Sequence, residues 1–196
     1  MTLHDCSLYA FEGAPGVGKT TTALATVAKL KAAGSSIGYC DESGRNNLLV
    51  EDYTLHGASL SINTELHLLT SSIADQILAS RLCGSLVCDK SPFSVLAYLS
   101  VLLGDTLKPT ERRLAQSMIA LTHAWSYSYD LIFVLQDRYG SNNSDDPVRA
   151  KVAHLQDDVE RAILSELNSS GVRYMLVPTD LSLDDRVDWI VAEMLG

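Results

Sequence analysis

The stretch Gly13-Ala14-Pro15-Gly16-Val17-Gly18-Lys19-Thr20 decides the fold of this chain. It fits the pattern G-x-x-x-x-G-K-[ST], in which small residues let backbone N–H groups turn inward around phosphate oxygens. Residues 7–12 are apolar and predict a strand before the stretch, and residues 18–33 predict a helix after it. A turn and helix cap without a ligand is the alternative, but a strand before and a helix after are the context that a phosphate loop requires. The sequence therefore predicts a phosphate-binding loop.

We expect this loop to hold ATP together with Mg²⁺. The ammonium of Lys19 is expected to reach the β- and γ-phosphates, and the hydroxyl of Thr20 is expected to bind the metal. The N-terminus of the following helix adds positive potential beside the phosphates. In this part of the chain, the residues expected to bind ATP are Gly13, Ala14, Gly16, Val17, Gly18, Lys19, Thr20 and Thr21.

The charge of the chain argues against broad binding of nucleic acid and not against nucleotides. The formal net charge is −9, from 15 basic and 24 acidic residues. An acidic chain is a poor partner for a long phosphate backbone, whereas local loops and a few cations decide the binding of a small anion. DNA is therefore not favoured as a partner, and a nucleoside or nucleotide fits better.

The length and composition fit one globular domain over residues 1–196. No apolar run approaches the roughly 20 residues that a membrane span needs, and the first residues have no basic segment typical of a signal peptide. The 4 cysteines show neither a C-x-x-C pair nor zinc spacing. We therefore expect buried free thiols and a cytoplasmic protein.

Short apolar strands alternate with helices along the whole chain. The strands are expected at residues 7–12, 36–41, 85–89, 131–135 and 172–177. The helices are expected at residues 18–33, 65–83, from 91 to 103, 109–125, 149–168 and 183–195. This alternation predicts an α/β fold with three layers, in which a five-stranded parallel sheet carries helices on both faces.

Helical spacing also predicts which side chains are buried. In the helix at residues 65–83, the apolar face holds Leu66, Leu69, Ile73, Ile77 and Leu78. In the helix at residues 149–168, it holds Val152, Leu155, Val159, Ile163 and Leu167. Trp125, Tyr127 and Tyr129 are expected to pack in the core or at a helix end rather than to stack on a base.

Parallel strands place ligands outside their carboxyl ends, so polar residues after each strand are candidates for one shared site. These residues are Asp41, Glu42 and Arg45, then Asp89 and Lys90, then Asp137, Arg138 and Arg149, and finally Thr179 and Asp180. We expect Asp89 to serve Mg²⁺; the alternative is that it caps the next helix, with Ser91 competing for that place. Glu42 is either a general base or acceptor ligand, or a solvated loop acid.

The segment at about residues 138–150 is rich in turn-forming residues and is expected to be a lid. Phosphoryl transfer needs cations around the migrating group, and Arg138 and Arg149 can supply them from this segment. The alternative for Arg149 is an ordinary surface arginine near the start of a helix.

Several short motifs resemble the thymidylate kinases and deoxynucleoside kinases. Phe11-Glu12-Gly13 resembles the entry to their phosphate loop, and residues 41–45 resemble their acidic-x-x-Arg substrate element. Residues 87–92 resemble their Asp-Arg-Ser segment and are also similar to the small AAA-type ATPases related to ribosylnicotinamide kinase. Val148-Arg149 looks like the lid arginine, and Thr179-Asp180 looks like the loop at the adenine edge. Lysine stands at position 90 where the family pattern has arginine, and lysine lacks the bidentate fork.

The resemblance implies an ATP- and Mg²⁺-dependent kinase of a nucleoside or nucleoside monophosphate. It implies catalytic roles for Lys19, Glu42, Asp89 and Arg149, acceptor binding by Glu42, Arg45, Lys90 and Arg138, and an adenine contact at Thr179. A homodimer is an open possibility for its assembly.

Three other functions are open alternatives. The first is a kinase that phosphorylates a hydroxyl on a modified base in DNA. The second is a P-loop ATPase or switch that acts on a partner protein; no glutamate directly follows Asp89, which weakens it. The third is a nucleotide-binding protein without chemistry.

Overall fold

In the computed structural model, which describes residues 5–44, 47–50, 61–137 and 153–196, the strands form one parallel sheet. The sheet has 5 strands in the order β2-β3-β1-β4-β5. The strands are β1 (Ser7–Glu12), β2 (Ile37–Cys40), β3 (Ser85–Asp89), β4 (Leu131–Val134) and β5 (Tyr174–Leu176). The predicted five-stranded parallel sheet is therefore confirmed, with β1 at its centre.

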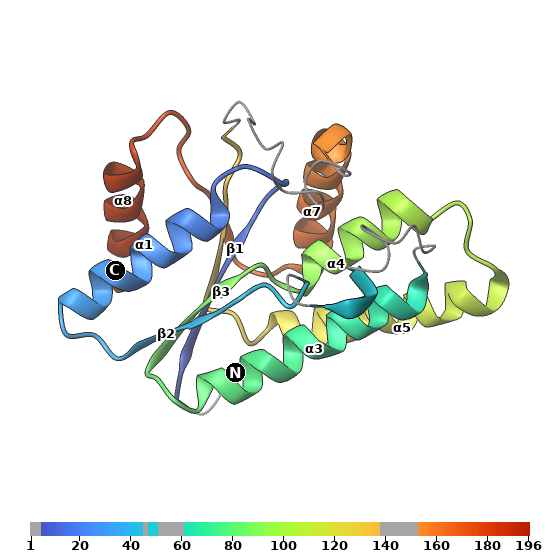
Figure 1. The fold of residues 1–196 in the computed structure, drawn as a ribbon, viewed down its shortest axis with the longest axis horizontal. Helices are drawn as coiled ribbons and strands as arrows, with labels where there is room; N and C mark the ends of the chain where they lie inside the picture. Colours follow the sequence, from blue (N-terminus) through green and yellow to red (C-terminus); the bar gives the residue numbers. More distant parts are fainter. Residues whose placement is uncertain (1–4, 45–46, 51–60, 138–152) are drawn as a thin grey trace.

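Helices cover both faces of this sheet, as Figure 1 shows. On one face lie α1 (Lys19–Ala32) and α8 (Leu183–Leu195). On the other side lie α3 (Ile62–Ser80), α4 (Pro92–Tyr98), α5 (Pro109–Ser126) and α7 (Gln156–Ser170). A π-helical turn over Leu99–Leu103 continues α4, and a 3-10 turn over Ala153–Leu155 precedes α7. The predicted three-layer α/β architecture is confirmed.

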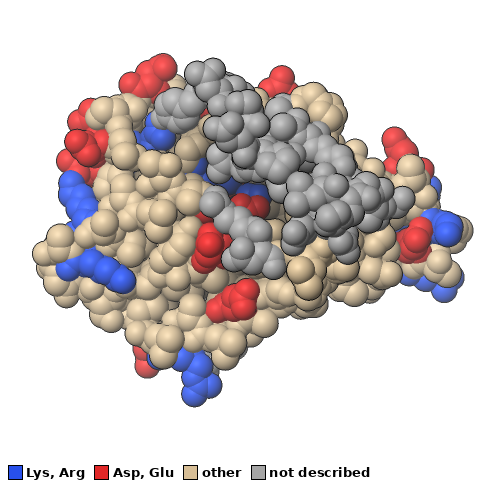
Figure 2. Space-filling view, in the orientation of Figure 1, with Lys and Arg blue, Asp and Glu red and all other residues tan. Residues whose placement is uncertain are grey.

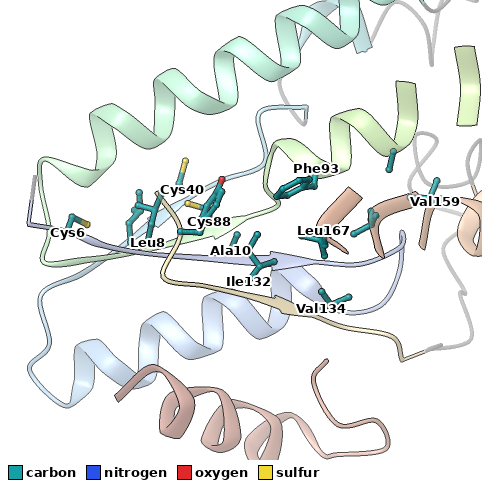
Figure 3. Close-up of a cluster of buried hydrophobic side chains, with 14 residues drawn as sticks. Cys6, Leu8, Ala10, Cys40, Cys88, Phe93, Ile132, Val134, Val159 and Leu167 are labelled. Carbon is teal, nitrogen blue, oxygen red and sulfur yellow. The ribbon is translucent and has the colours of Figure 1, made fainter. Parts of the chain in front are cut away.

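The three central strands, β3, β1 and β4, are largely buried on both faces, which is why they read as continuous apolar runs. Along β1, Leu8 and Ala10 face one cluster and Phe11 faces the other, as the two-residue period of a strand requires. The first cluster packs against α4 and α7, where Val159 is fully buried (Figure 3). The second packs against α1 and α8. The central strand is thereby fixed between two helix layers.

The register of β1 brings its neighbours' carboxyl ends to one rim. Phe11 pairs with Asp89 of β3, and Glu12 pairs with Val134 of β4. The order in which strands join the sheet changes side at β1, since β2 and β3 lie on one side of it and β4 and β5 on the other. In open parallel sheets, ligands bind at such a switch point.

The start of α3 and its buried face differ from the prediction. The helix begins at Ile62 rather than residue 65, because the Ser61 hydroxyl caps it and accepts a hydrogen bond from the N–H of Thr64 (3.4 Å). Leu78, predicted to be buried, has 65% of its surface exposed. Gln76 is buried instead, and its side-chain oxygen accepts hydrogen bonds from the indole of Trp125 (2.9 Å) and the hydroxyl of Tyr129 (2.7 Å).

Other predictions at the ends of elements had mixed outcomes. The helix α7 begins at Gln156 after a 3-10 turn over residues 153–155, and the first residues of the predicted helix, 149–152, lie outside the described residues. Its predicted face is confirmed at Val159, Ile163 and Leu167. Tyr127 is 67% exposed and does not pack as predicted. The predicted lid at about residues 138–150 lies within residues 138–152, outside the described residues.

The cysteines are free thiols, and Cys6, Cys40 and Cys88 are buried, as predicted. Among the described helices, none combines the length and the apolar character needed to cross a bilayer.

One buried charge joins three elements at the edge of the sheet. The guanidinium of Arg186 in α8 is 2% exposed and lies 2.8 Å from the carboxylate of Asp137, which follows β4. It also donates to the hydroxyl of Thr22 in α1 (3.4 Å). The second oxygen of Asp137 accepts from the N–H of Asp180 after β5 (3.1 Å).

We predict that Arg186→Met lowers the free energy of unfolding by about 3–5 kcal/mol, because it leaves the Asp137 carboxylate buried and without its counter-charge. Urea unfolding followed by circular dichroism measures this loss. The double variant Arg186→Met/Asp137→Asn is the matched control. It keeps an oxygen for the N–H of Asp180 while removing both charges, and it should recover a large part of the loss. A loss below about 1 kcal/mol for Arg186→Met would contradict the prediction.

Candidate active site

The phosphate loop depends on glycines in backbone conformations that other residues rarely adopt. Gly13, Gly16 and Gly18 have φ angles of 136°, 82° and 85°. A Cβ atom on Gly13 would lie 2.3 Å from the carbonyl oxygen of Leu135, so the loop passes too close to the end of β4 for any side chain. Gly18 is the N-cap of α1, which aims the helix N-terminus into the loop.

The side chain of Lys19 contacts the backbone of the phosphate loop. Its ammonium donates hydrogen bonds to the carbonyls of Gly13 (2.8 Å) and Ala14 (2.7 Å), and the residue is 7% exposed. Burial and then the charge of Lys90 lower the pKa of Lys19 to about 8, although the acids around it, led by Glu12, act in the opposite direction. Phosphate oxygens beside this ammonium would favour its charged form.

Thr20 and Asp89 meet at the mouth of the loop. The Thr20 hydroxyl donates to the carboxylate of Asp89 at 2.5 Å, and Asp89 is 2% exposed. The Tyr39 hydroxyl donates to the same carboxylate oxygen (3.2 Å). The alternative in which Asp89 caps α4 is wrong, because Ser91 is the N-cap and its hydroxyl accepts from the N–H of Phe93 (3.2 Å). Asp89 is therefore not needed as a helix cap.

A buried carboxylate that the sequence analysis did not single out lies next to these residues. Glu12, at the end of β1, is fully buried. It accepts hydrogen bonds from the N–H (2.7 Å) and hydroxyl (2.5 Å) of Ser91, from the hydroxyl of Ser94 (2.6 Å) and from the N–H of Gly13 (3.4 Å). Glu12 thereby joins the phosphate loop to the first turn of α4. An acid that ends an apolar strand directly before a phosphate loop is the signal that could have identified it.

The structure brings together Glu42 and Lys90, which follow the strands β2 and β3. Their side chains form an ion pair, and they are 25% and 20% exposed. The ammonium of Lys90 also lies 5.5 Å from the ring centroid of Tyr98 in α4. Burial lowers the pKa of Lys90, but the carboxylate of Glu42 and then Tyr98 outweigh it, and the net shift is upward. Lys90 also has a positive φ of 82°, a backbone strain of the kind found at functional sites.

Glu65 is a second buried acid that the sequence analysis did not identify. It lies in the first turn of α3 and is 3% exposed. Its Oε2 atom has no hydrogen-bond partner among the described residues. Burial raises the pKa of Glu65 to about 7, and Lys90 acts in the opposite direction.

The position of Glu65 in the helix does not account for its burial. An acid in the first turn of a helix contributes about 0.3–1 kcal/mol through the helix dipole. A buried acceptor without a partner costs about 1–3 kcal/mol. The second effect is the larger, so we expect the burial of Glu65 to cost more than its place in the helix dipole returns. From sequence alone, a first-turn acid is explained by the dipole, and nothing in the pattern reveals the burial.

Of the remaining predicted site residues, some lie outside the described part of the chain and others are exposed. Arg45, Arg138 and Arg149 lie outside the described residues. Thr21 is exposed on α1, and Thr179 is exposed in the segment after β5. On the face shown in Figure 2, described Lys and Arg side chains lie singly or in small groups among acidic ones.

We predict that Glu65 makes stability fall as pH rises. Its pKa is about 7 in the folded protein against an ordinary value of 4.5. Between these values the folded state binds more protons than the unfolded state, so the free energy of unfolding decreases with pH. Glu65→Gln has no proton to lose. Its stability relative to wild type should therefore grow by up to about 3 kcal/mol between pH ~4.5 and ~8. Urea unfolding across this range measures the difference, and a pH-independent difference would contradict the prediction.

Comparisons with known proteins agree with this fold. The family model described as AAA domain matches residues 8–186. Among solved structures, a thymidylate kinase from Ehrlichia chaffeensis is similar with a TM-score of 0.58 and 16% sequence identity. The likeness covers 97% of this chain and 99% of that chain. No curated protein matches the sequence.

The family match takes in the phosphate loop, the Glu42 and Lys90 pair, and Arg186 at its end. The likeness to the thymidylate kinase spans all three layers and concerns the fold. The earlier resemblance to P-loop nucleotide kinases is confirmed at the level of fold. The chain belongs to the AAA domain family and has the fold of the P-loop nucleotide kinases.

Proposed function

We propose that this protein transfers the γ-phosphoryl group of ATP to a hydroxyl or phosphate of a nucleoside or nucleoside monophosphate. The observation that carries the proposal is the placement of Glu42 and Lys90 beside the phosphate loop, because it adds an acceptor side to a nucleotide site. An ATP-binding loop alone is equally compatible with an ATPase. A carboxylate held at the same rim by a lysine supplies the base and orienting cation that transfer to an acceptor needs.

On the nucleotide side, the loop amides and the N-terminus of α1 bind the phosphates, and Lys19 exchanges its loop carbonyls for phosphate oxygens. Thr179 is proposed to contact the adenine edge. Arg149 is proposed to approach the transferred group from residues 138–150.

The residues at the mouth of the loop fit Mg²⁺. This ion prefers oxygen ligands and is commonly bound through one or two carboxylates together with substrate phosphates. Thr20 and Asp89 provide a hydroxyl and a carboxylate 2.5 Å apart beside the loop. Among the described residues, no group of 3 or more histidine, cysteine, aspartate and glutamate side chains is arranged to hold a metal ion. When bound, the ion neutralises charge on the β- and γ-phosphates.

On the acceptor side, Glu42 takes the proton of the attacking hydroxyl, and Lys90 holds Glu42 in place and binds the acceptor. Arg45 and Arg138 are proposed as further acceptor ligands. A hydroxyl on a modified base in DNA is an alternative acceptor, and a switch acting on a partner is an alternative function. A cytoplasmic location and a homodimer also stay predictions.

A panel of acceptors tests the proposal. The protein is incubated with γ-labelled ATP and Mg²⁺ against nucleosides, nucleoside monophosphates, ribosylnicotinamide and oligonucleotides that carry hydroxymethylated bases. Label on a free nucleoside or nucleotide supports the proposal. Label on the oligonucleotide alone favours the DNA alternative, and release of free phosphate with no labelled acceptor favours the ATPase.

We predict that Lys19→Ala lowers the rate of phosphoryl transfer by at least about a hundred-fold, since it removes a preorganised charge at the phosphates. ATP binding should weaken as well. Lys31→Ala is the control, because Lys31 is an exposed lysine near the far end of the same helix. Steady-state kinetics and isothermal titration measure the two effects, and circular dichroism checks the fold. Normal turnover in Lys19→Ala would contradict the proposal that this loop binds the phosphates of ATP.

We predict that Glu42→Gln lowers turnover by about a hundred-fold to ten-thousand-fold, the usual cost of losing a general base. The KM for ATP should change little. The comparison variant Lys90→Met tests whether Glu42 acts only by holding the lysine: it should raise the acceptor KM more than it lowers turnover. If Glu42→Gln weakens ATP binding and leaves turnover intact, the carboxylate belongs to the nucleotide side.

A further inference from the structure

The buried carboxyl of Glu65 lies on the acceptor side of the site. Lys90 lowers its pKa, and Glu65 in turn raises the pKa of Tyr98, so the three groups are within electrostatic range of one another. Gly44, in the segment after β2, approaches α3 closely enough that a Cβ atom there would lie 3.9 Å from Leu68 and 3.5 Å from Glu42. The first turns of α3 therefore adjoin the loop that carries Glu42.

The neighbouring charges do not satisfy this carboxyl. Lys90 makes its ion pair with Glu42 and stands over the ring of Tyr98. Ser61 caps the helix through its own hydroxyl. Oε2 of Glu65 is left without a hydrogen-bond partner in the described part of the chain. A polar group kept buried and unpaired next to a binding site is of the kind that a ligand completes.

We propose that Glu65 is a specificity-determining residue of the acceptor site, where its carboxyl accepts a hydrogen bond from an N–H or O–H group of the acceptor. This inference rests on the proposed function. It assigns the ligand at this position to the donor-bearing part of a nucleoside, a base N–H or a sugar hydroxyl. A phosphate does not fit here, since the described charged groups that act on Tyr98 beside this position are the carboxylates of Glu42, Glu12 and Glu65 against the cation Lys90.

The burial of Glu65 would let the site discriminate between acceptors with and without a suitable hydrogen-bond donor. A site built around an unpaired polar group rejects a ligand that cannot complete it, because the group then stays buried and unsatisfied. An acceptor whose donor has been methylated should therefore be rejected by the wild-type protein much more strongly than its size alone explains.

The test uses Glu65→Gln and Glu65→Met with γ-labelled ATP and a panel of thymidine, deoxycytidine, deoxyguanosine, ribosylnicotinamide and their N- or O-methylated derivatives. For the nucleoside that the wild type labels best, Glu65→Met should raise the acceptor KM at least about ten-fold, and the KM for ATP should stay within about two-fold. Glu65→Gln keeps an acceptor oxygen and should lose less. Methylation of the recognised donor should weaken the wild type about ten-fold or more and weaken Glu65→Met little further.

Each outcome decides the matter. Transfer by all three proteins with the same acceptor KM, or an equal rise in both KM values, overturns the role of Glu65 and leaves the proposed function standing. Transfer by the wild type to none of the panel overturns the proposed function for nucleosides, and the role of Glu65 with it. Thermal unfolding of the ligand-free proteins at about pH 8 is the second measurement. Glu65→Met should raise the unfolding temperature, and a lower temperature would show that the carboxyl is structural and overturn the inference.

Discussion

The hydrogen bonds of the Glu12 carboxylate are the constraint on which the arrangement of the site depends. This carboxylate is fully buried at the carboxyl end of the central strand, so it requires donors from the protein in place of water. Ser91 and Ser94 supply them from the first turn of α4. Because Asp89 and Lys90 directly precede Ser91, the same bonds hold the end of β3 beside the phosphate loop. Asp89 and Lys90, which we propose serve Mg²⁺ and the acceptor, therefore share one anchor.

Much of the fold could be predicted because its determinants are local. The strands β1 and β3 and the helix α8 have the predicted bounds, since apolar runs, a glycine loop and a serine cap mark their ends. The errors occur where distant contacts override the local pattern. Leu78 belongs to the apolar stripe of α3 but is exposed, and Gln76 is buried, because Trp125 and Tyr129 provide its hydrogen bonds from elsewhere in the chain.

In the candidate site, too, some residues could be predicted from local sequence and others could not. The phosphate loop is a contiguous motif, and residues at strand ends must share a rim, so Lys19, Thr20 and Asp89 could be placed in advance. The ion-pair partner of each charged residue could not be predicted. Glu42 and Lys90 meet because β2 and β3 are neighbours in the sheet, and the sequence does not give that strand order. The burial of Glu65 could not be predicted for another reason. It depends on how α3 packs against α4, β2 and β3, and the spacing of residues within α3 does not reveal that packing.

Most charged groups in this site have a partner within the protein, and these internal contacts limit the free energy that a ligand gains on binding. Lys19 donates to loop carbonyls, Thr20 donates to Asp89, and Lys90 pairs with Glu42. A phosphate or acceptor must replace these contacts, so its net gain is the difference between new and old interactions. At Oε2 of Glu65 no hydrogen bond to the described part of the chain has to be broken first. A donor that reaches this atom gains the whole interaction and relieves the cost of burial as well. Under the proposed function, we therefore expect selectivity among acceptors to concentrate at Glu65 and the paired residues to provide the binding and chemistry that all acceptors share.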